Sequence, residues 1–440
     1  MMRKISILML GAACGWWAAN VDAATADMTL DNGLRVVVRE DHRSPVVVVE
    51  VAYRVGAVDE KDGKTGLAHM LEHMMFKGTA KVPSEQYSRI VAHYGGEENA
   101  FTTDDYTAYY QVEAADRLPL ALELEADRME GLSLRAEDFK EEHRVVMEER
   151  RWRVEDNPMA LAGEHFSAVA NMASPYRRPT IGWMPDIQGL TIDDVRDWYH
   201  TWYAPNNAVL VVVGDVDTKQ VMAEAKHFFA GLKAHPLPAA VVPREPEVPG
   251  ERCLKLQVKT QVPTLLMAFN APGLRTAEHS DDVYALTMLA GILDQGDSSR
   301  LAQDLVRGQQ IASTADVGYS GIARGDTLVE FSGIPAQGHG LADLRAAFLK
   351  EIKALQDRAP SEEEMNRVRA QLEAADIFSH DSLSGIASSL VSFEAIGLTW
   401  HDRDAYMDRL RQVTPAQVQA VARTYLVPER MTVGELEPKP

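Results

Sequence analysis

The residues with the clearest chemical potential in this sequence are two histidines and a glutamate in the stretch His69-Met70-Leu71-Glu72-His73. Residues 66–76 are rich in Leu, Ala, Met, His and Glu, a composition that predicts a helix, on which residues three and four apart share one face. Two imidazoles on that face can bind one zinc ion, while an adjacent carboxylate polarises a water on the metal. The order HxxEH is the inverse of the better-known HExxH motif. Such a pentapeptide also arises by chance, so two ordinary helix histidines are the competing interpretation.

A third protein ligand must come from elsewhere, because a catalytic zinc site has three protein ligands and one open position for water. The acidic segment 141–149 contains Glu142 and Glu149, which are seven residues apart and therefore lie on one face of a helix. Glu148 points in another direction. Charge runs of this kind are more often solvated helix surfaces. Spacing alone leaves the third ligand open.

The elements that position these residues begin with strands. Asn32-Gly33 favours a tight turn, and valine-rich runs at 35–40 and 45–55 are typical of strands. The helix with the HxxEH motif follows them. Residues 99–103 alternate in a way that predicts a further strand. This strand could be an ordinary internal strand or one with a function.

A repeat organises the rest of the chain. Thr191 and Thr414 are 223 positions apart, and each is followed at +4, +11 and +14 by a valine, an aromatic residue and a proline, and then by an apolar run. Each copy predicts a threonine N-cap, an amphipathic helix, a proline stop and a strand. The period is too long for a solenoid and indicates two similar halves, although two such units can also coincide. A capping box is predicted separately at Ser361 with Glu364.

A terminal apolar segment and a proline-rich segment predict the domain boundaries. Residues 1–26 have two basic residues, an apolar run at 5–19 and small residues at the end, the pattern of a cleaved signal peptide. Five prolines between 236 and 249 predict a semi-rigid linker. We expect a signal peptide at 1–26, an N-terminal zinc-bearing domain at 27–233, a linker at 234–253 and a similar C-terminal domain at 254–440. The expected location is the periplasm or the exterior, and Cys14 lies in a poor context for lipid attachment.

Composition excludes several classes of protein. The chain has 440 residues, of which 46% are hydrophobic and 25% charged, as in soluble globular proteins. Its formal charge of −20 disfavours nucleic acid and anionic lipid as partners. Cys14 and Cys253 are its two cysteines, so we expect no structural disulfide. No run beyond the signal segment is long and apolar enough to predict a membrane span.

Ordered motifs along nearly the whole mature chain resemble the pitrilysin/insulinase/mitochondrial processing peptidase family of zinc metallopeptidases, in its bacterial half-length form. They are Asn32-Gly33-Leu34, Gly56 with Glu60, His69 to His73 with Phe76-Lys77-Gly78-Thr79, Gly95-Gly96, Asn99-Ala100-Phe101-Thr102, Thr107 with Tyr109-Tyr110, Glu142 with Glu149, Pro179-Thr180-Ile181-Gly182, Tyr203-Ala204-Pro205-Asn206-Asn207, Gly214-Asp215 and Ser298-Ser299-Arg300-Leu301.

The resemblance implies specific roles for this chain's residues. Its pattern selects Glu149 as the third zinc ligand beside His69 and His73, with Glu148 as runner-up, and Glu142 as the partner that orients a ligand histidine. Glu72 is implied as the general base. The strand with Asn99, Ala100 and Phe101 is implied as a sheet edge to which an extended peptide substrate adds.

The resemblance also implies an α+β fold of two similar, pseudo-symmetric domains, each a mostly antiparallel sheet with helices packed on one side. Position 292, equivalent to His69 in the repeat, lies in an apolar stretch, so no metal site is expected in the second half. Active members need an arginine and, seven residues later, a tyrosine from the second half. Arg307 is available, but Thr314 stands at the tyrosine's position and Ser313 would stand there after a one-residue gap.

A missing tyrosine predicts a heterodimer with a similar chain that lacks HxxEH and supplies the arginine and tyrosine. The alternatives are a homodimer in which Tyr319 substitutes, and a weakly active monomer. A different class remains open, a noncatalytic peptide-binding or assembly subunit that retains zinc. A lyase of the S-ribosylhomocysteine type, which also has HxxEH, is disfavoured because it is far shorter and has cysteines near its metal.

Overall fold

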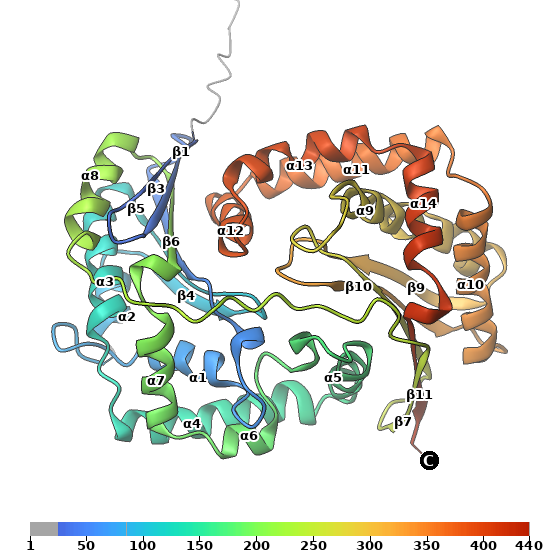
Figure 1. The fold of residues 1–440 in the computed structure, drawn as a ribbon, viewed down its shortest axis with the longest axis horizontal. Coiled ribbons are helices and arrows are strands. Elements are labelled where there is room, and N and C mark those ends of the chain that lie inside the picture. The colour runs from blue at the N-terminus through green and yellow to red at the C-terminus, as the bar shows by residue number, and fades with distance from the viewer. Residues whose placement is uncertain (1–24, 85, 440) are drawn as a thin grey trace, which may run out of the picture.

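The computed structural model describes residues 25–84 and 86–439 (Figure 1). Most of the predicted signal peptide lies outside the described residues. Its last two residues, Thr25 and Ala26, already belong to β1 (Thr25–Thr29), where they pair with Arg39 and Val38 of the neighbouring strand.

The first half of the chain forms a six-stranded sheet in the order β1-β2-β6-β3-β5-β4. Its further strands are β2 (Arg35–Glu40), β3 (Val46–Tyr53), β4 (Glu97–Thr102), β5 (Thr107–Ala114) and β6 (Ala208–Gly214). The pair β2–β6 is parallel and the other pairs are antiparallel. β4 pairs only with β5, so it is an edge of the sheet.

The second half forms a five-stranded sheet in the order β7-β11-β8-β10-β9. Its strands are β7 (Arg252–Val258), β8 (Thr264–Ala271), β9 (Ala312–Tyr319), β10 (Thr327–Pro335) and β11 (Met431–Pro438). Only β7–β11 is parallel. This order repeats β2-β6-β3-β5-β4 of the first half, and β9 therefore corresponds to β4.

Helices of each half pack mainly on one face of its own sheet (Figure 1). Those of the first half are α1 (Leu67–Met74), α2 (Gln86–His93), α3 (Leu118–Gly131), α4 (Ala136–Arg150), α5 (Pro158–Ala170), α6 (Met184–Gln188), α7 (Ile192–Trp202) and α8 (Thr218–Phe229), with a π-helical turn η3 (Arg151–Glu155) after α4. Those of the second half are α9 (Asp281–Asp294), α10 (Leu341–Asp357), α11 (Glu362–Ser379), α12 (Leu383–Ala395), α13 (Trp400–Gln412) and α14 (Pro415–Tyr425), with a π-helical segment η6 (Leu301–Gly308). Short 3-10 turns are η1 (Ala57–Asp59), η2 (Ala115–Arg117), η4 (Pro175–Arg177), η5 (Pro205–Asn207) and η7 (Pro428–Arg430).

The helix starts predicted from the repeat are confirmed. Thr191 begins α7 and Thr414 begins α14, each with a capping box in which the threonine hydroxyl accepts from the backbone N–H three residues later. A proline-initiated 3-10 turn and a strand follow both helices. Ser361 caps α11 in the same way. α9, the counterpart of α1, is apolar around residue 292, where Leu289, Ile292 and Leu293 are fully buried.

The other face of each sheet is covered by a helix from the opposite half. Ile386, Leu390 and Val391 of α12 pack on buried valines of β2, β3 and β6. In return, Phe166 and Ala170 of α5 pack on β8 and β10. α12 occupies nearly the same place in the second repeat as α5 does in the first, so the two halves exchange equivalent helices.

An extended segment joins the halves. Residues 233–251 have no helix or strand, and Figure 1 shows this segment crossing from one half to the other before β7 begins at Arg252. Among the described residues, no single helix is long and apolar enough to cross a membrane, and one bent pair, α12 with α13 at 101°, meets the length and composition criteria together.

Candidate metal centre

The helix that carries the HxxEH motif is fixed at its N-terminus by two devices. Gly66 precedes α1 with φ of 85°, a left-handed conformation that favours glycine, and a Cβ there would lie 2.5 Å from the Ile181 carbonyl oxygen. The buried carboxylate of Glu60 accepts hydrogen bonds from Gly66 N (2.9 Å) and Ala68 N (2.8 Å). Carboxyl oxygens at a helix N-terminus satisfy N–H groups that have no partner within the helix. The start of α1 is therefore held in one position.

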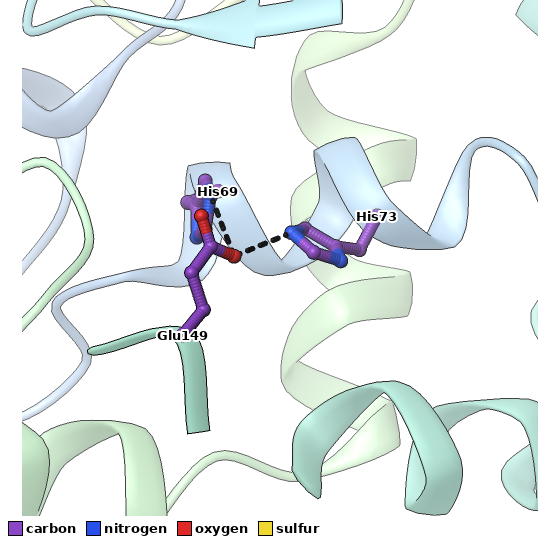
Figure 2. Close-up of side chains that lie close together, drawn as sticks. All are labelled: His69, His73 and Glu149. Atoms are coloured by element: carbon purple, nitrogen blue, oxygen red, sulfur yellow. Dashed lines mark ion pairs between the residues drawn. The ribbon is translucent and has the colours of Figure 1, made fainter. Parts of the chain in front are cut away.

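The three predicted zinc ligands converge on one point. Figure 2 shows His69 and His73 from α1 on either side of the Glu149 carboxylate from α4. Glu149 Oε2 lies 3.7 Å from His69 Nε2 and 3.2 Å from His73 Nε2, and one ligand atom of each residue lies within 4.8 Å of the other two. In a tetrahedral site with bonds of about 2.0–2.1 Å, ligand atoms are roughly 3.3 Å apart. The donor set and its spacing therefore fit zinc.

Electrostatics at this point also suit a cation. Burial lowers the pKa of His69 to about 4, and the neighbouring His73 contributes, so His69 is neutral as a metal ligand must be. Burial would also lower the pKa of His73, but hydrogen bonds to Glu142 and Glu149 outweigh it and raise that pKa to about 9. The hydrogen bond from His73 lowers the pKa of Glu149. Two carboxylates thus favour positive charge at His73, which a metal ion would supply in place of the proton.

Glu142 lies behind His73, on the side away from Glu149. Its Oε2 is 3.1 Å from His73 Nδ1, and its Oε1 is 2.5 Å from Lys77 Nζ. Burial would raise the pKa of Glu142, but its contacts with His73 and Lys77 lower it, so the carboxylate is ionised. An ionised acceptor at Nδ1 holds the proton on that nitrogen and leaves Nε2 free to bind a metal.

Glu72 occupies the wall of the same cavity without being one of the three clustered ligands. Its Oε2 accepts a hydrogen bond of 2.5 Å from the Thr102 hydroxyl at the end of β4. Burial raises the pKa of Glu72, although the Thr102 hydrogen bond opposes the shift. A carboxylate with a raised pKa is a better proton acceptor near neutral pH than an exposed one.

The cavity around these residues has a volume of about 730 Å³ and runs along the sheet edge. Asn99, Ala100 and Phe101, the predicted substrate strand, lie in β4 and line it. Thr180 and Ile181 form another part of the wall. All its lining residues within the described part of the chain come from the first half.

Three residues considered as candidates from the sequence do not line this cavity. Glu148, the alternative ligand, has a side chain that is 70% exposed and pairs with Arg151. Arg307 lies in η6 beside the second sheet, where it pairs with Asp297 at 2.9 Å, and it does not line the cavity. Tyr319, considered as a substitute for the missing tyrosine, donates its hydroxyl to the Pro272 carbonyl at 2.6 Å.

Three further side chains touch the site, and the sequence assigned no role to any of them. Thr102 holds Glu72, Lys77 pairs with Glu142, and Arg153 in the π-helical turn pairs with Glu149 Oε1 at 3.0 Å. Arg153 follows Glu149 by four residues, a spacing that brings side chains together on a helix and was therefore available as a signal. Lys77 lies beyond the end of α1 and pairs with Glu142 of α4, a contact that no local spacing indicates. π-helical turns often occur at functional sites, but their positions have no simple sequence signature.

Two family models match most of the chain. Residues 35–183 match the family described as Insulinase (Peptidase family M16), and residues 189–372 match the Peptidase M16 inactive domain. The zinc protease PqqE of Helicobacter pylori is 31% identical over 445 residues, which cover 98% of this chain and 97% of that protein. This chain belongs to peptidase family M16. The family resemblance inferred from the motifs is confirmed.

Other M16 relatives agree. The mitochondrial-processing peptidase subunit beta of Lentinula edodes is 26% identical and covers 84% of this chain and 81% of its own length. A solved structure of a protease from Helicobacter pylori superimposes with a TM-score of 0.87 at 29% identity, covering 94% of this chain and all of that one. A Pseudomonas fluorescens structure described as a peptidase M16 inactive domain has a TM-score of 0.82 at 17% identity, which shows the shared fold alone. The predicted α+β fold of two similar halves is confirmed, and relatives named zinc proteases support a metallopeptidase.

Proposed function

We propose that this chain is an exported zinc metalloendopeptidase that hydrolyses extended peptides. The observation that carries the proposal is the convergence of His69, His73 and Glu149 within 4.8 Å, in a cavity whose wall also contains Glu72. The residues would hold one zinc ion. When bound, that ion acts as a Lewis acid, which polarises a carbonyl group and lowers the pKa of water.

The residues around the metal position have separate roles in proton transfer and in orienting side chains. Glu72 takes the proton of the attacking water on its carboxylate and passes it to the leaving amine, a role that suits its buried position and raised pKa. Thr102 orients that carboxylate by its hydrogen bond to Oε2. Glu142 keeps the proton of His73 on Nδ1.

The substrate is an extended peptide that adds to the β4 edge. Main-chain hydrogen bonds to an edge strand provide affinity with little demand on sequence. Asn99, Ala100 and Phe101 lie on that edge and line the cavity, so a peptide backbone added there would lie close to Glu72. Unfolded or short peptides therefore fit better than folded domains.

We further propose that a partner completes the site. No residue of the second half lines the cavity within the described chain, and Arg307 pairs with Asp297 on another part of the molecule. A similar chain that lacks HxxEH and contributes an arginine and a tyrosine is the expected partner in a heterodimer, and a homodimer is the alternative. Export to the periplasm is supported by residues 1–26 and by a relative of known structure, the periplasmic protease PqqL of Escherichia coli.

The role of Glu72 is tested by Glu72→Gln with Glu148→Gln as a matched control. Glu148 lies next to a ligand but is exposed, so its variant should keep full turnover of an unstructured peptide. Glu72→Gln should lose turnover by about a hundredfold to ten-thousandfold while binding one equivalent of zinc. Retained turnover in Glu72→Gln would contradict the role, and absence of stoichiometric zinc in the native chain would contradict the metal site.

The need for a partner is tested by assaying the chain alone and mixed with a candidate partner, with and without a chelator. Chelator-sensitive activity that requires the mixture supports the shared site. Full activity of the isolated monomer contradicts it. Peptide binding without hydrolysis in the complete assembly would favour a noncatalytic assembly subunit.

A further inference from the structure

A second cavity, of about 190 Å³, lies where the first half, the linker and the second half meet. Its charged lining residues are Arg54 after β3, Arg275 after β8 and Arg324 in the turn between β9 and β10. No acidic residue lines it within the described chain. In a protein with 65 acidic and 45 basic residues, a cavity whose charges are all positive needs a physical reason.

Two of these arginines have donor capacity to spare. Arg54 Nε donates to the Glu394 carbonyl (3.2 Å), and Arg275 Nη1 donates to the Gly397 carbonyl (2.7 Å), at the end of α12. Capping of these helix carbonyls explains one donor of each side chain, but a guanidinium has five N–H donors. Among the described residues neither arginine has an ion pair, whereas Arg324 is neutralised by Asp59.

Electrostatics single out Arg54 as the under-compensated charge. Burial lowers its pKa, and the nearby cations Arg35 and Arg275 add to that effect, against a single opposing carboxylate at Glu394. The Glu394 carboxylate hydrogen-bonds to Arg35, and Arg54 contacts only the backbone carbonyl of Glu394. An anion in the cavity would compensate the charge of Arg54 and Arg275 directly.

Apart from Asn207, the other side chains of the wall are apolar. Trp202, Leu237, Pro238, Val242 and Ile396 line the cavity. A bare inorganic anion would leave that surface without a partner, whereas a ligand with both an anionic and an apolar end would contact both parts. The volume corresponds to about six waters at ~30 Å³ each, which is the size of one amino-acid residue.

We propose that this cavity binds a small organic carboxylate with an apolar side group, the chemistry of the C-terminal residue of a hydrophobic peptide. The carboxylate lies between Arg54 and Arg275, and the side group lies against Trp202 and Pro238. Because the walls come from both halves and from the linker crossing between them (Figure 1), the ligand stabilises their association. The site is separate from the metal centre, since the two cavities share no lining residue.

The test is calorimetric titration of the full zinc-loaded chain with N-acetyl-L-leucine and with N-acetyl-L-leucinamide. The first ligand carries the carboxylate and the second replaces it with a neutral amide. We expect binding of the acid, at least tenfold weaker binding of the amide, and at least tenfold weaker binding of the acid to Arg54→Gln and Arg275→Gln. Arg411→Gln, an exposed arginine of α13, is the control and should bind as the native chain does.

Three results would overturn the proposal. The first is equal binding of the acid and the amide. The second is undiminished binding of the acid by both arginine variants, which would place the ligand at the metal centre. The third is binding of inorganic phosphate in preference to the acid. Each change also removes a guanidinium that caps a carbonyl at the end of α12, so the thermal unfolding of both variants is measured. The more exposed Arg275 variant keeps the test valid if Arg54→Gln fails to fold.

Discussion

Replacing Arg324 by glutamine is expected to lower the free energy of unfolding by about 3–5 kcal/mol. Arg324 is 8% exposed and donates from Nη1 and Nη2 to the two carboxylate oxygens of Asp59, at 2.8 and 2.9 Å. It also donates to the carbonyls of Asp105 (3.1 Å) and, in the linker, Val241 (3.0 Å). The Asp59 side chain is fully buried, so removal of the guanidinium leaves a carboxylate without its counter-ion in a site of low dielectric. Arg324 is therefore a buried charged link between the two halves.

The assay is urea unfolding followed by tryptophan fluorescence, with limited proteolysis of the linker as a second readout. Arg177→Gln is the control, because Arg177 forms an exposed ion pair with Asp62 at 2.8 Å that should contribute about 1 kcal/mol or less. Asp59→Asn combined with Arg324→Gln should destabilise less than the sum of the two single changes. A loss below about 1 kcal/mol for Arg324→Gln, or strict additivity of the pair, would refute the reasoning.

Three further predictions test local features. Burial raises the pKa of Glu50 from its usual 4.5 to about 8, so the unfolded chain loses this proton first as the pH rises. The contribution of Glu50 to the free energy of unfolding should be complete below about pH 4.5 and fall by up to roughly 1.4 kcal/mol per pH unit until about pH 8. Urea unfolding of Glu50→Gln at several pH values should lack this part of the pH dependence. Glu142→Gln should weaken zinc binding about 10–100-fold in competition with a chelator, because His73 loses its ionised acceptor, and unchanged affinity would argue against that role. Gly66→Ala should lower the melting temperature more than Gly63→Ala, since both have φ near 85° but only at Gly66 would a Cβ meet backbone atoms; equal losses would mean that the close approach is unimportant.

Local sequence patterns predicted the parts of this molecule that local physics determines. The face shared by His69, Glu72 and His73 follows from helical periodicity, and the threonine caps of α7 and α14 follow from side-chain chemistry over four residues. The family resemblance then selected Glu149 from an acidic segment whose spacing left the choice open. The structure brings Glu149 to the two histidines because α4 packs beside α1.

Contacts between distant segments were beyond such reasoning. Nothing in the sequence of α12 indicates that its apolar face covers the sheet of the opposite half, since an apolar helix face does not specify its partner. The cavity between the halves escaped prediction for the same reason: Arg54, Arg275 and the linker are far apart in the chain and meet only in the folded protein. Arg307 was predicted from its position in a family pattern, and its surroundings in η6 depend on packing that the pattern does not contain.

The exchange of α5 and α12 has a consequence for how this protein can be handled. One face of each sheet is shielded from water by a helix of the other half. Because separating the halves would expose these apolar faces, the two fragments of a chain cleaved in the linker should stay associated. A fragment ending at residue 233 would expose the valine-rich surface of β2, β3 and β6 to water, and insolubility of that fragment is the expected result. Expression, crystallisation and engineering should therefore treat the two-half chain as the smallest self-sufficient unit.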